Sequence, residues 1–214
     1  MTGMTAARTP STSPADRPRL GLRERKKIKT REAIRAATYA LVAEQGYDAT
    51  TIDQIAERAE VSPSTVFRYF PTKEDIVLTD EYDLLMADEL RARPAGEPLI
   101  QSLRYVIHRA VDRALAEDPE VARLRVRLGV EVPAVRGRML ESMASTGALL
   151  RRVIADRTGL DPEALEVRVH AMSLIGGLME VNRYWGETGQ QDDLGALMER
   201  ALDVLEHGLP VENR

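Results

Sequence analysis

The chain has 214 residues, with 30 Lys and Arg against 34 Asp and Glu, no cysteine and 4% aromatic residues. The lack of thiols excludes a disulfide scaffold, a thiolate zinc site and a thiol nucleophile. Alanine and leucine, both good helix formers, are abundant, so the composition favours an all-α fold. The net charge of −4, taken as a total, argues against a nucleic-acid partner.

The distribution of charge argues the other way. Between Arg17 and Arg35 nine residues are basic and two are acidic, every lysine lies at or before Lys73, and the region beyond residue 80 is acidic. Because phosphate binding depends on the local field, this basic segment predicts contact with a polyanion. Considered alone, the segment is also compatible with a solvated helix face beside a disordered tail.

Neither a signal peptide nor a membrane span is predicted. The stretch 9–14 is polar and no apolar segment follows it, unlike a secretory signal. The best apolar candidate, 171–181, is too short to cross a bilayer. We therefore expect a cytoplasmic protein without a membrane partner.

Helix signals follow a Thr-, Ser- and Pro-rich stretch, 1–20, which we expect to be a disordered arm. Thr51, Ser62 and Thr72 are expected N-caps, and Pro63 takes the first helical position after Ser62. The last of these caps opens one long helix, 73–91, which a Pro- and Gly-containing linker follows. Further helices are expected at 98–117, 119–130, 133–157, 161–186 and 192–207, making about nine in all.

The short helix after Ser62 carries the clearest functional signal. Two short helices joined by a tight turn and flanked by longer ones form a helix-turn-helix arrangement, in which Val66 and Phe70 brace the second helix. Its other face can read base edges and bind phosphates in the major groove. Lys73, at the next helix start, adds a cation beside free backbone N–H groups. The predicted contact residues are Arg25, Lys26, Lys27, Lys29, Arg31, Thr51, Ser62, Pro63, Ser64, Thr65, Phe67, Arg68, Tyr69 and Lys73.

The segment TTIDQIAERAEVSPSTVFRYFPTKEDIV, residues 50–77, resembles the DNA-binding domain of the TetR/AcrR family of bacterial transcriptional repressors. The resemblance covers roughly residues 23–78. It implies base and backbone contacts by Pro63, Ser64, Thr65 and Phe67, and phosphate contacts by Thr51, Tyr69 and Lys73. The chain departs from the family pattern at Glu60, where a turn glycine is common, at Phe67, where tyrosine is frequent, and at Asp53, which repels phosphate.

The same resemblance implies a C-terminal domain that binds a small ligand and dimerises through its last two helices, here 161–186 and 192–207. Glycines inside a helix are unfavourable, so Gly176-Gly177 indicates close approach of a helix or ligand, or a local kink in ordinary packing. The domains are then an arm (1–20), a helix-turn-helix domain (21–72), a connecting helix with linker (73–97) and a ligand-binding and dimerisation domain (98–214).

Ligand contacts are harder to predict, because apolar and aromatic side chains at helical spacing usually belong to the core. The C-terminal region loosely resembles actinobacterial family members with acyl-CoA-like ligands, which implies an apolar or acyl-CoA-like inducer. Five arginines between Arg123 and Arg138 either meet an anionic part of such a ligand or form a solvated face. The candidate ligand residues are Tyr105, His108, Arg109, Met139, Met143, Met172, Asn182, Tyr184 and Trp185.

Two other classes of function fit the sequence less well. The three histidines lack metal-ligand spacing, and no P-loop, Gly-rich nucleotide motif or G-x-S-x-G elbow is present. We therefore expect no catalytic residue, metal or cofactor. A helical adaptor binding an acidic surface needs only a basic helix, without the turn and short second helix found here. The predicted function is a ligand-responsive repressor that binds a near-palindromic operator as a homodimer and is released by an inducer.

Overall fold

The computed structural model describes residues 21–78 and 81–209, and within these ranges the chain forms ten α-helices and no strand. The predicted arm, 1–20, lies outside the described residues. The N-terminal helices are α1 (Leu22–Gln45), α2 (Ile52–Arg58), α3 (Pro63–Tyr69) and α4 (Lys73–Val77). The remaining helices are α5 (Glu81–Arg91), α6 (Leu99–Glu117), α7 (Pro119–Glu131), α8 (Pro133–Thr158), α9 (Leu165–Glu187) and α10 (Leu194–His207). The predicted all-α fold is confirmed.

The three predicted N-caps of the helix-turn-helix region are present. The side chains of Thr51, Ser62 and Thr72 accept hydrogen bonds from the third backbone N–H of α2, α3 and α4, respectively. Each cap satisfies a backbone donor that the helix itself leaves free, so the limits of these short helices follow from local sequence.

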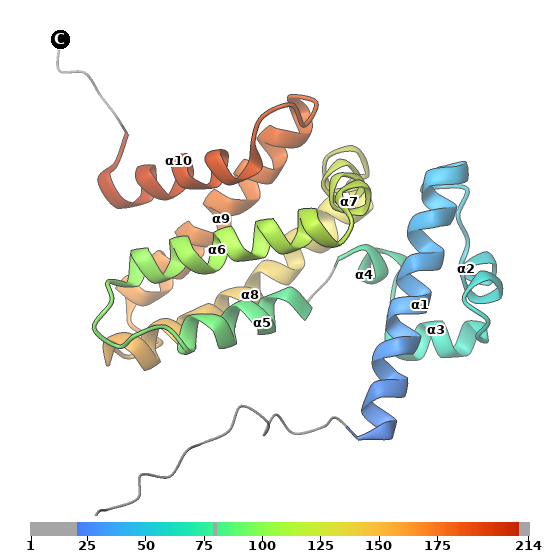
Figure 1. Ribbon diagram of the computed structural model, residues 1–214, viewed down its shortest axis with the longest axis horizontal. Coiled ribbons are helices and arrows are strands. Elements are labelled where there is room, and N and C mark those ends of the chain that lie inside the picture. The colour runs from blue at the N-terminus through green and yellow to red at the C-terminus, as the bar shows by residue number, and fades with distance from the viewer. Residues whose placement is uncertain (1–20, 79–80, 210–214) are drawn as a thin grey trace, which may run out of the picture.

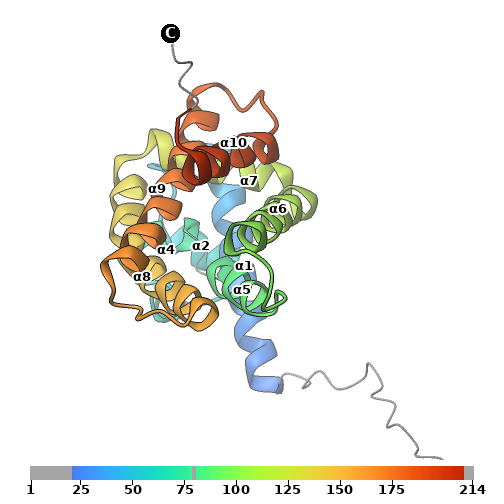
Figure 2. The same ribbon diagram turned by 90° about the vertical axis from the view of Figure 1, so that its left-hand side faces the viewer.

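The helices form an N-terminal and a C-terminal domain, each with its own hydrophobic cluster, and a third cluster, the junction cluster, lies between them (Figure 1). The N-terminal cluster joins α1 to α4 through fully buried side chains such as Ile34, Ile55 and Ile76. In the C-terminal domain α5, α6, α8 and α9 lie around a common core, and α10 lies across α6 and α9 (Figure 2). A third cluster connects the two domains, with Tyr39 of α1 and Val77 of α4 against Leu128 of α7 and Val135 of α8.

The prediction of one long helix over 73–91 is wrong, because the chain leaves the helix at Leu78. The backbone there is extended (φ −84°, ψ 118°), and the Tyr39 hydroxyl donates to the carbonyl of Val77 at 3.0 Å. Both Val77 and Leu78 pack into the junction cluster. Successive side chains of a continuous helix point about 100° apart, so the break lets both residues face the same cluster.

The predicted start of the helix at 161 is also wrong. The side chain of Asp161 accepts a hydrogen bond from the N–H of Glu163 at 2.9 Å, and its carbonyl accepts one from the N–H of Ala164 at 3.0 Å. Asp161 to Ala164 therefore form a turn that contains Pro162, and α9 begins only at Leu165.

The turn from α2 into α3 places Glu60, where a turn glycine is common in the family, in the left-handed region, at φ +54°. A side chain with a Cβ is strained there, whereas glycine is not. Glu60→Gly should therefore raise the free energy of unfolding by about 1 kcal/mol, measured by urea denaturation. The control is Glu57→Gly in the last turn of α2, which should lower the free energy of unfolding, because glycine is a poorer helix former than glutamate. Destabilisation by Glu60→Gly contradicts this account.

Candidate nucleic-acid interface and ligand cavity

α3 is fixed by one face and exposes the other. Val66 and Phe70 are fully buried against α1 and α2. A helix of seven residues is too short to be stable alone, so α3 depends on these two contacts. Thr65 and Tyr69 are half-buried. The exposed residues of the helix and its cap are Ser62, Pro63, Ser64, Phe67 and Arg68. α2 lies on the side of α1 that faces away from the C-terminal domain, and α3 extends from beneath α1 toward that same side (Figure 1).

Arginines of α1 hold the C-terminal end of α3. The guanidinium of Arg31 donates to the carbonyl of Tyr69 at 3.1 Å and lies 4.4 Å above the centre of the Phe70 ring. The guanidinium of Arg35 lies over the same ring at 5.4 Å. Arg31, predicted as a DNA contact, thus also positions α3, and the positioning role of Arg35 was missed because its cation–π partner is distant in sequence.

Lys73 links α4 to the turn between α1 and α2. Its ammonium donates to the carbonyls of Tyr47 at 2.8 Å and Thr50 at 3.0 Å, and it lies 3.9 Å from the centre of the Tyr47 ring. The Tyr47 hydroxyl donates to the carboxylate of Glu74 at 2.7 Å. Burial together with this carboxylate raises the pKa of Tyr47. Two of the three donors of Lys73 are therefore engaged within the protein.

The predicted DNA contacts on α1 and α2 lie on the surface. Arg25, Lys26, Lys27 and Lys29 are exposed on the first turns of α1, the end of the helix that extends beyond α3 (Figure 1). The hydroxyl of Thr51 is exposed but serves the cap of α2. Arg58 of α2 forms a two-point ion pair with Glu44, with N–O distances of 2.6 and 2.8 Å, so its charge is locally compensated.

An ion pair joins the two domains at α4. The Nε of Arg138 on α8 donates to the carboxylate of Asp75 at 2.6 Å, and the same carboxylate completes the capping box of α4 with Thr72. Burial would raise the pKa of Asp75, but the hydrogen bonds from Arg138 and Thr72 outweigh it and lower the pKa. Any movement of α8 at Arg138 therefore acts on the cap of α4.

The C-terminal domain contains an apolar cavity of about 100 Å³ between α5, α6, α8 and α9. Its wall consists of aliphatic and methionine side chains, among them Met86, Leu103, Ile107 and Leu174, with Thr146 as the one polar residue. Such a wall suits an uncharged, apolar molecule.

Comparison with known proteins decides the family. Residues 34–79 match the family model described as "Bacterial regulatory proteins, tetR family", and residues 97–210 match the one described as the MftR C-terminal domain. The chain belongs to the TetR family. It is 32% identical over 195 residues to the HTH-type transcriptional regulator TcmR of Streptomyces glaucescens, and the aligned region covers 86% of each chain.

Other relatives of this TetR-family chain are also regulators. It is 31% identical over 148 residues to the repressor KstR of Mycolicibacterium smegmatis, covering 68% of this chain and 70% of that one. The crystal structure of TylP, a TetR regulator from Streptomyces fradiae, shares 28% identity with a TM-score of 0.51, covering 86% of this chain and 89% of that one. Thermus thermophilus FadR in complex with lauroyl-CoA shares the fold at 22% identity, with a TM-score of 0.56 over 86% of this chain and 97% of that one. The chain is thus a DNA-binding transcriptional regulator and not an enzyme.

The structure places none of the predicted ligand residues on the wall of the cavity. Trp185 is buried in the core, and its indole N–H donates to the carbonyl of Asp192 at 2.8 Å. His108 contacts the carboxylate of Glu199 on α10 at 2.5 Å. Tyr105 lies on the surface, where the guanidinium of Arg93 stacks on its ring at 3.9 Å.

The other six predicted ligand residues are spread over separate regions. Met139 packs in the junction cluster, and Asn182 donates to the carbonyl of Leu178 within α9. The guanidinium of Arg109 donates a hydrogen bond to the hydroxyl of Tyr105. Met143 is half-buried, and Met172 and Tyr184 are exposed. Their helical spacing indicated that they lie on helices but not which neighbouring helix each one faces. The residues that line the cavity are mostly ordinary aliphatic side chains, which carry no sequence signature.

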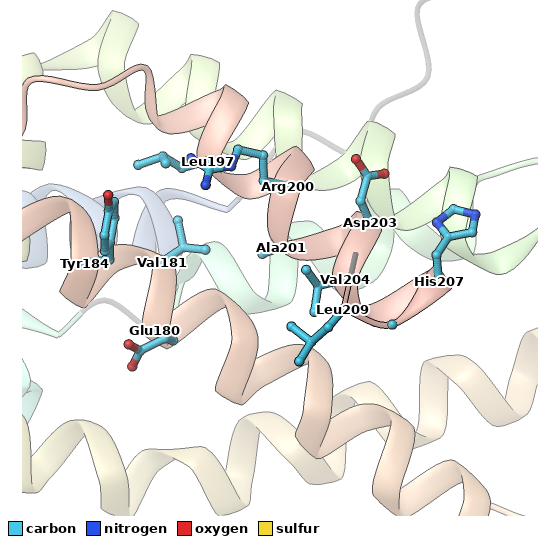
Figure 3. A pocket seen from close by; sticks show the side chains of 11 residues that line it. Glu180, Val181, Tyr184, Leu197, Arg200, Ala201, Asp203, Val204, His207 and Leu209 are labelled. Atoms are coloured by element: carbon cyan, nitrogen blue, oxygen red, sulfur yellow. The ribbon is translucent and has the colours of Figure 1, made fainter. Parts of the chain in front are cut away.

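The TetR-family chain exposes a broad apolar surface on its last two helices. Leu165, Val169 and Met172 form a stripe on α9 that is 70, 56 and 41% exposed. A groove lies between the same two helices, with Val181 and Tyr184 on one side and Val204 on the other (Figure 3). Charged side chains, among them Glu180, Arg200 and Asp203, also line this groove. Scattered apolar residues on a surface are normal, whereas a contiguous patch indicates a contact with another molecule.

In the described part of the chain no helix is both long and apolar enough to cross a membrane.

The two glycines inside α9 differ in their surroundings. A Cβ on Gly177 would lie 3.3 Å from the side chain of Leu205, so this glycine allows α10 to approach closely. A Cβ on Gly176 would meet no atom within 4 Å. Gly176 follows Met172 by one helical turn and therefore belongs to the exposed stripe.

Proposed function

We propose that the chain is a ligand-responsive transcriptional repressor that binds a near-palindromic operator as a homodimer and is released by a small-molecule inducer. The observation that carries the proposal is α3, whose outer face is exposed while Val66, Phe70 and Arg31 fix the helix from behind. Such a helix is suited to enter the major groove, with two copies about one helical turn of DNA apart. We place its site of action in the cytoplasm, where the chromosome of a bacterium lies.

The proposed DNA contacts fall into two groups. Ser62, Pro63, Ser64, Thr65, Phe67 and Arg68 contact bases and the adjacent backbone, while the basic first turns of α1 contact phosphates from the side. Thr51, Tyr69 and Lys73 take phosphates at the helix ends. Lys73 keeps one N–H donor for that purpose, because its other two are bound to carbonyls.

The apolar surface on α9 and α10 is the proposed dimer interface. A partner subunit that covers the stripe and the groove removes their side chains from water, at about 25 cal/mol per Å² of apolar surface. Gly176 leaves room for a helix of the partner to approach closely, because a Cβ there would meet no atom within 4 Å in the single chain. The interface also sets the distance between the two α3 helices.

Gly176→Leu should convert the dimer into a folded monomer, because the new side chain would occupy the space taken by the partner helix. Gly137→Leu on α8 is the matched control, since a Cβ there also meets no atom within 4 Å. Sedimentation velocity measures the mass of each variant, and far-UV circular dichroism checks the helix content. A Gly176→Leu variant that remains dimeric contradicts this interface.

One helix can transmit ligand binding to the DNA-binding domain. α8 contributes Thr146, Leu150 and Val153 to the cavity wall, and about two turns earlier it holds α4 through Arg138 and Val135. An apolar inducer that enlarges the cavity between α5 and α8 moves this helix and changes the position of α4. The separation of the two α3 helices then no longer matches the operator.

Related folds support an inducer with a hydrocarbon chain. Thermus thermophilus FadR was solved with lauroyl-CoA and Bacillus subtilis FadR with stearoyl-CoA. In this chain the cavity wall carries no charged side chain, so only the apolar part of such a molecule fits inside it. A charged headgroup must remain outside the cavity wall.

A mobility-shift titration tests the proposed function. Purified full-length protein is titrated against the DNA that flanks its own gene, between about 50 and 200 mM salt. Specific binding that weakens steeply with salt, and is lost on adding a long-chain acyl-CoA or another apolar metabolite, supports repression relieved by an inducer. Binding to no genomic fragment, or binding insensitive to salt, contradicts it.

A further inference from the structure

The two phenylalanines of the chain, both on or next to α3, lie in opposite environments. Phe70 is buried, and Arg31 and Arg35 stack on its ring. Phe67 is 53% exposed. Within residues 21–78, Leu22 at the start of α1 is the one large apolar side chain more exposed than Phe67. Exposure of the ring adds nothing to stability, and Phe67 stands on the part of α3 that carries the proposed DNA contacts.

The neighbours of Phe67 on α3 place its ring on the outer face. Pro63 and Ser64 lie one turn before it and are exposed. Arg68, which points about 100° further round the helix, is exposed as well. Val66 and Phe70, whose side chains are buried in the N-terminal cluster, anchor the helix. The short helix cannot rotate to bury Phe67 without exposing Val66, so the ring stays on the surface that meets the partner.

A phenyl ring selects its own kind of contact on that partner. It carries no hydroxyl, so it cannot hydrogen-bond a phosphate or a base edge. The major groove offers one apolar group that varies with sequence, the C5-methyl group of thymine. The exposed side chains of Ser64 and Arg68, in contrast, are able to form hydrogen bonds.

We propose that Phe67 packs against the C5-methyl group of one thymine in each half-site, so that this residue sets a thymine requirement in the operator. The inference rests on the proposed function, because it needs α3 in the major groove. Ser64 and Arg68 then bind polar groups on either side of the methyl contact.

Deoxyuridine scanning of the operator tests the inference. An operator is first selected from random duplex DNA with the full-length protein, and each thymine is then replaced singly by deoxyuridine, which removes the methyl group and keeps the base pairing. We expect one position per half-site to weaken binding about fourfold, the effect of exposing one methyl-sized apolar group, and the two positions together about tenfold or more.

The decisive measurement is the same scan with Phe67→Ala. This variant should bind the thymine operator more weakly and should show no further loss at the Phe67 position, while deoxyuridine elsewhere has unchanged effects. Arg68→Ala is the control, and it should retain the deoxyuridine penalty. The scans are run at about 50 mM salt, where weak variants still bind measurably, and Phe67→Tyr, which keeps the ring, should retain the penalty as well.

Three outcomes separate the possibilities. A penalty that disappears only in Phe67→Ala supports the inference. Specific binding in which no deoxyuridine penalty depends on Phe67 overturns the inference and leaves the proposed function intact. The same result is expected if the Phe67 ring wedges between base steps, because it then responds to the step and not to the methyl group. Failure to select any DNA sequence overturns the proposed function itself.

Discussion

Arg68→Ala is expected to weaken operator binding about a hundredfold. Arg68 is exposed on the outer face of α3, where its guanidinium lies near the ring of Tyr69 at 5.4 Å. A lost arginine contact to a base or phosphate costs about 1–3 kcal/mol, and a dimer loses it twice. Fluorescence anisotropy with the selected operator measures the change.

The salt dependence of the variant identifies the partner of Arg68. If the guanidinium binds phosphate, the slope of log K against log salt falls by about two for the dimer. If it reads a base, the slope stays and discrimination at that base pair is lost. Arg58→Ala is the control, because Glu44 already compensates that charge, and it should change affinity less than about threefold. Equal effects of the two substitutions contradict the role of α3.

The largest effect on stability is expected at Arg157 of α8, which holds the connection between α5 and α6. Its guanidinium donates to four backbone carbonyls and to the hydroxyl of Ser102, at distances of 2.9–3.2 Å. The carbonyls belong to Leu90, Arg93, Pro94 and Glu97. One side chain therefore binds three carbonyls of a connection that forms no helix of its own, and one carbonyl at the end of α5.

Arg157→Met should lower the free energy of unfolding by about 3 kcal/mol, because it removes charged hydrogen bonds to partly buried acceptors. Arg152→Met, an exposed position on the same helix, should change it by less than about 0.5 kcal/mol. Urea denaturation measures both at one protein concentration, since association contributes to the apparent stability. A small effect at Arg157 means that water replaces the guanidinium at these carbonyls.

A second hydrogen-bond network, centred on Glu97, also stabilises the connection between α5 and α6. The carboxylate of Glu97 accepts hydrogen bonds from Arg93 and from the hydroxyl of Ser102, and these bonds lower its pKa to about 2. Ser102 is fully buried and contacts both Glu97 and Arg157. The connection between α5 and α6, which lies beside the cavity residue Leu90, is thus fixed by side chains from three separate parts of the chain.

Features that depend on neighbouring residues were predicted from the sequence. Thr51, Ser62 and Thr72 cap helices through hydrogen bonds that span three residues. The family pattern marked Glu60 as a departure, and the structure shows that it takes the left-handed conformation. The helix-turn-helix and the all-α class follow from such local signals together with the apolar spacing. The total charge of −4 was misleading, whereas its uneven distribution along the chain indicated the DNA-binding end.

Features that depend on distant residues required the tertiary structure. The break at Leu78 follows from Tyr39 and the junction cluster, and Lys73 is drawn inward by carbonyls more than twenty residues away. The apolar cavity arises where four helices meet, and only the packing of α10 distinguishes Gly177 from Gly176. The sequence determined which segments become helices, because caps and periodicity act over a few residues. The tertiary structure decided which face of each helix meets which neighbour, because that depends on packing between segments far apart in the chain.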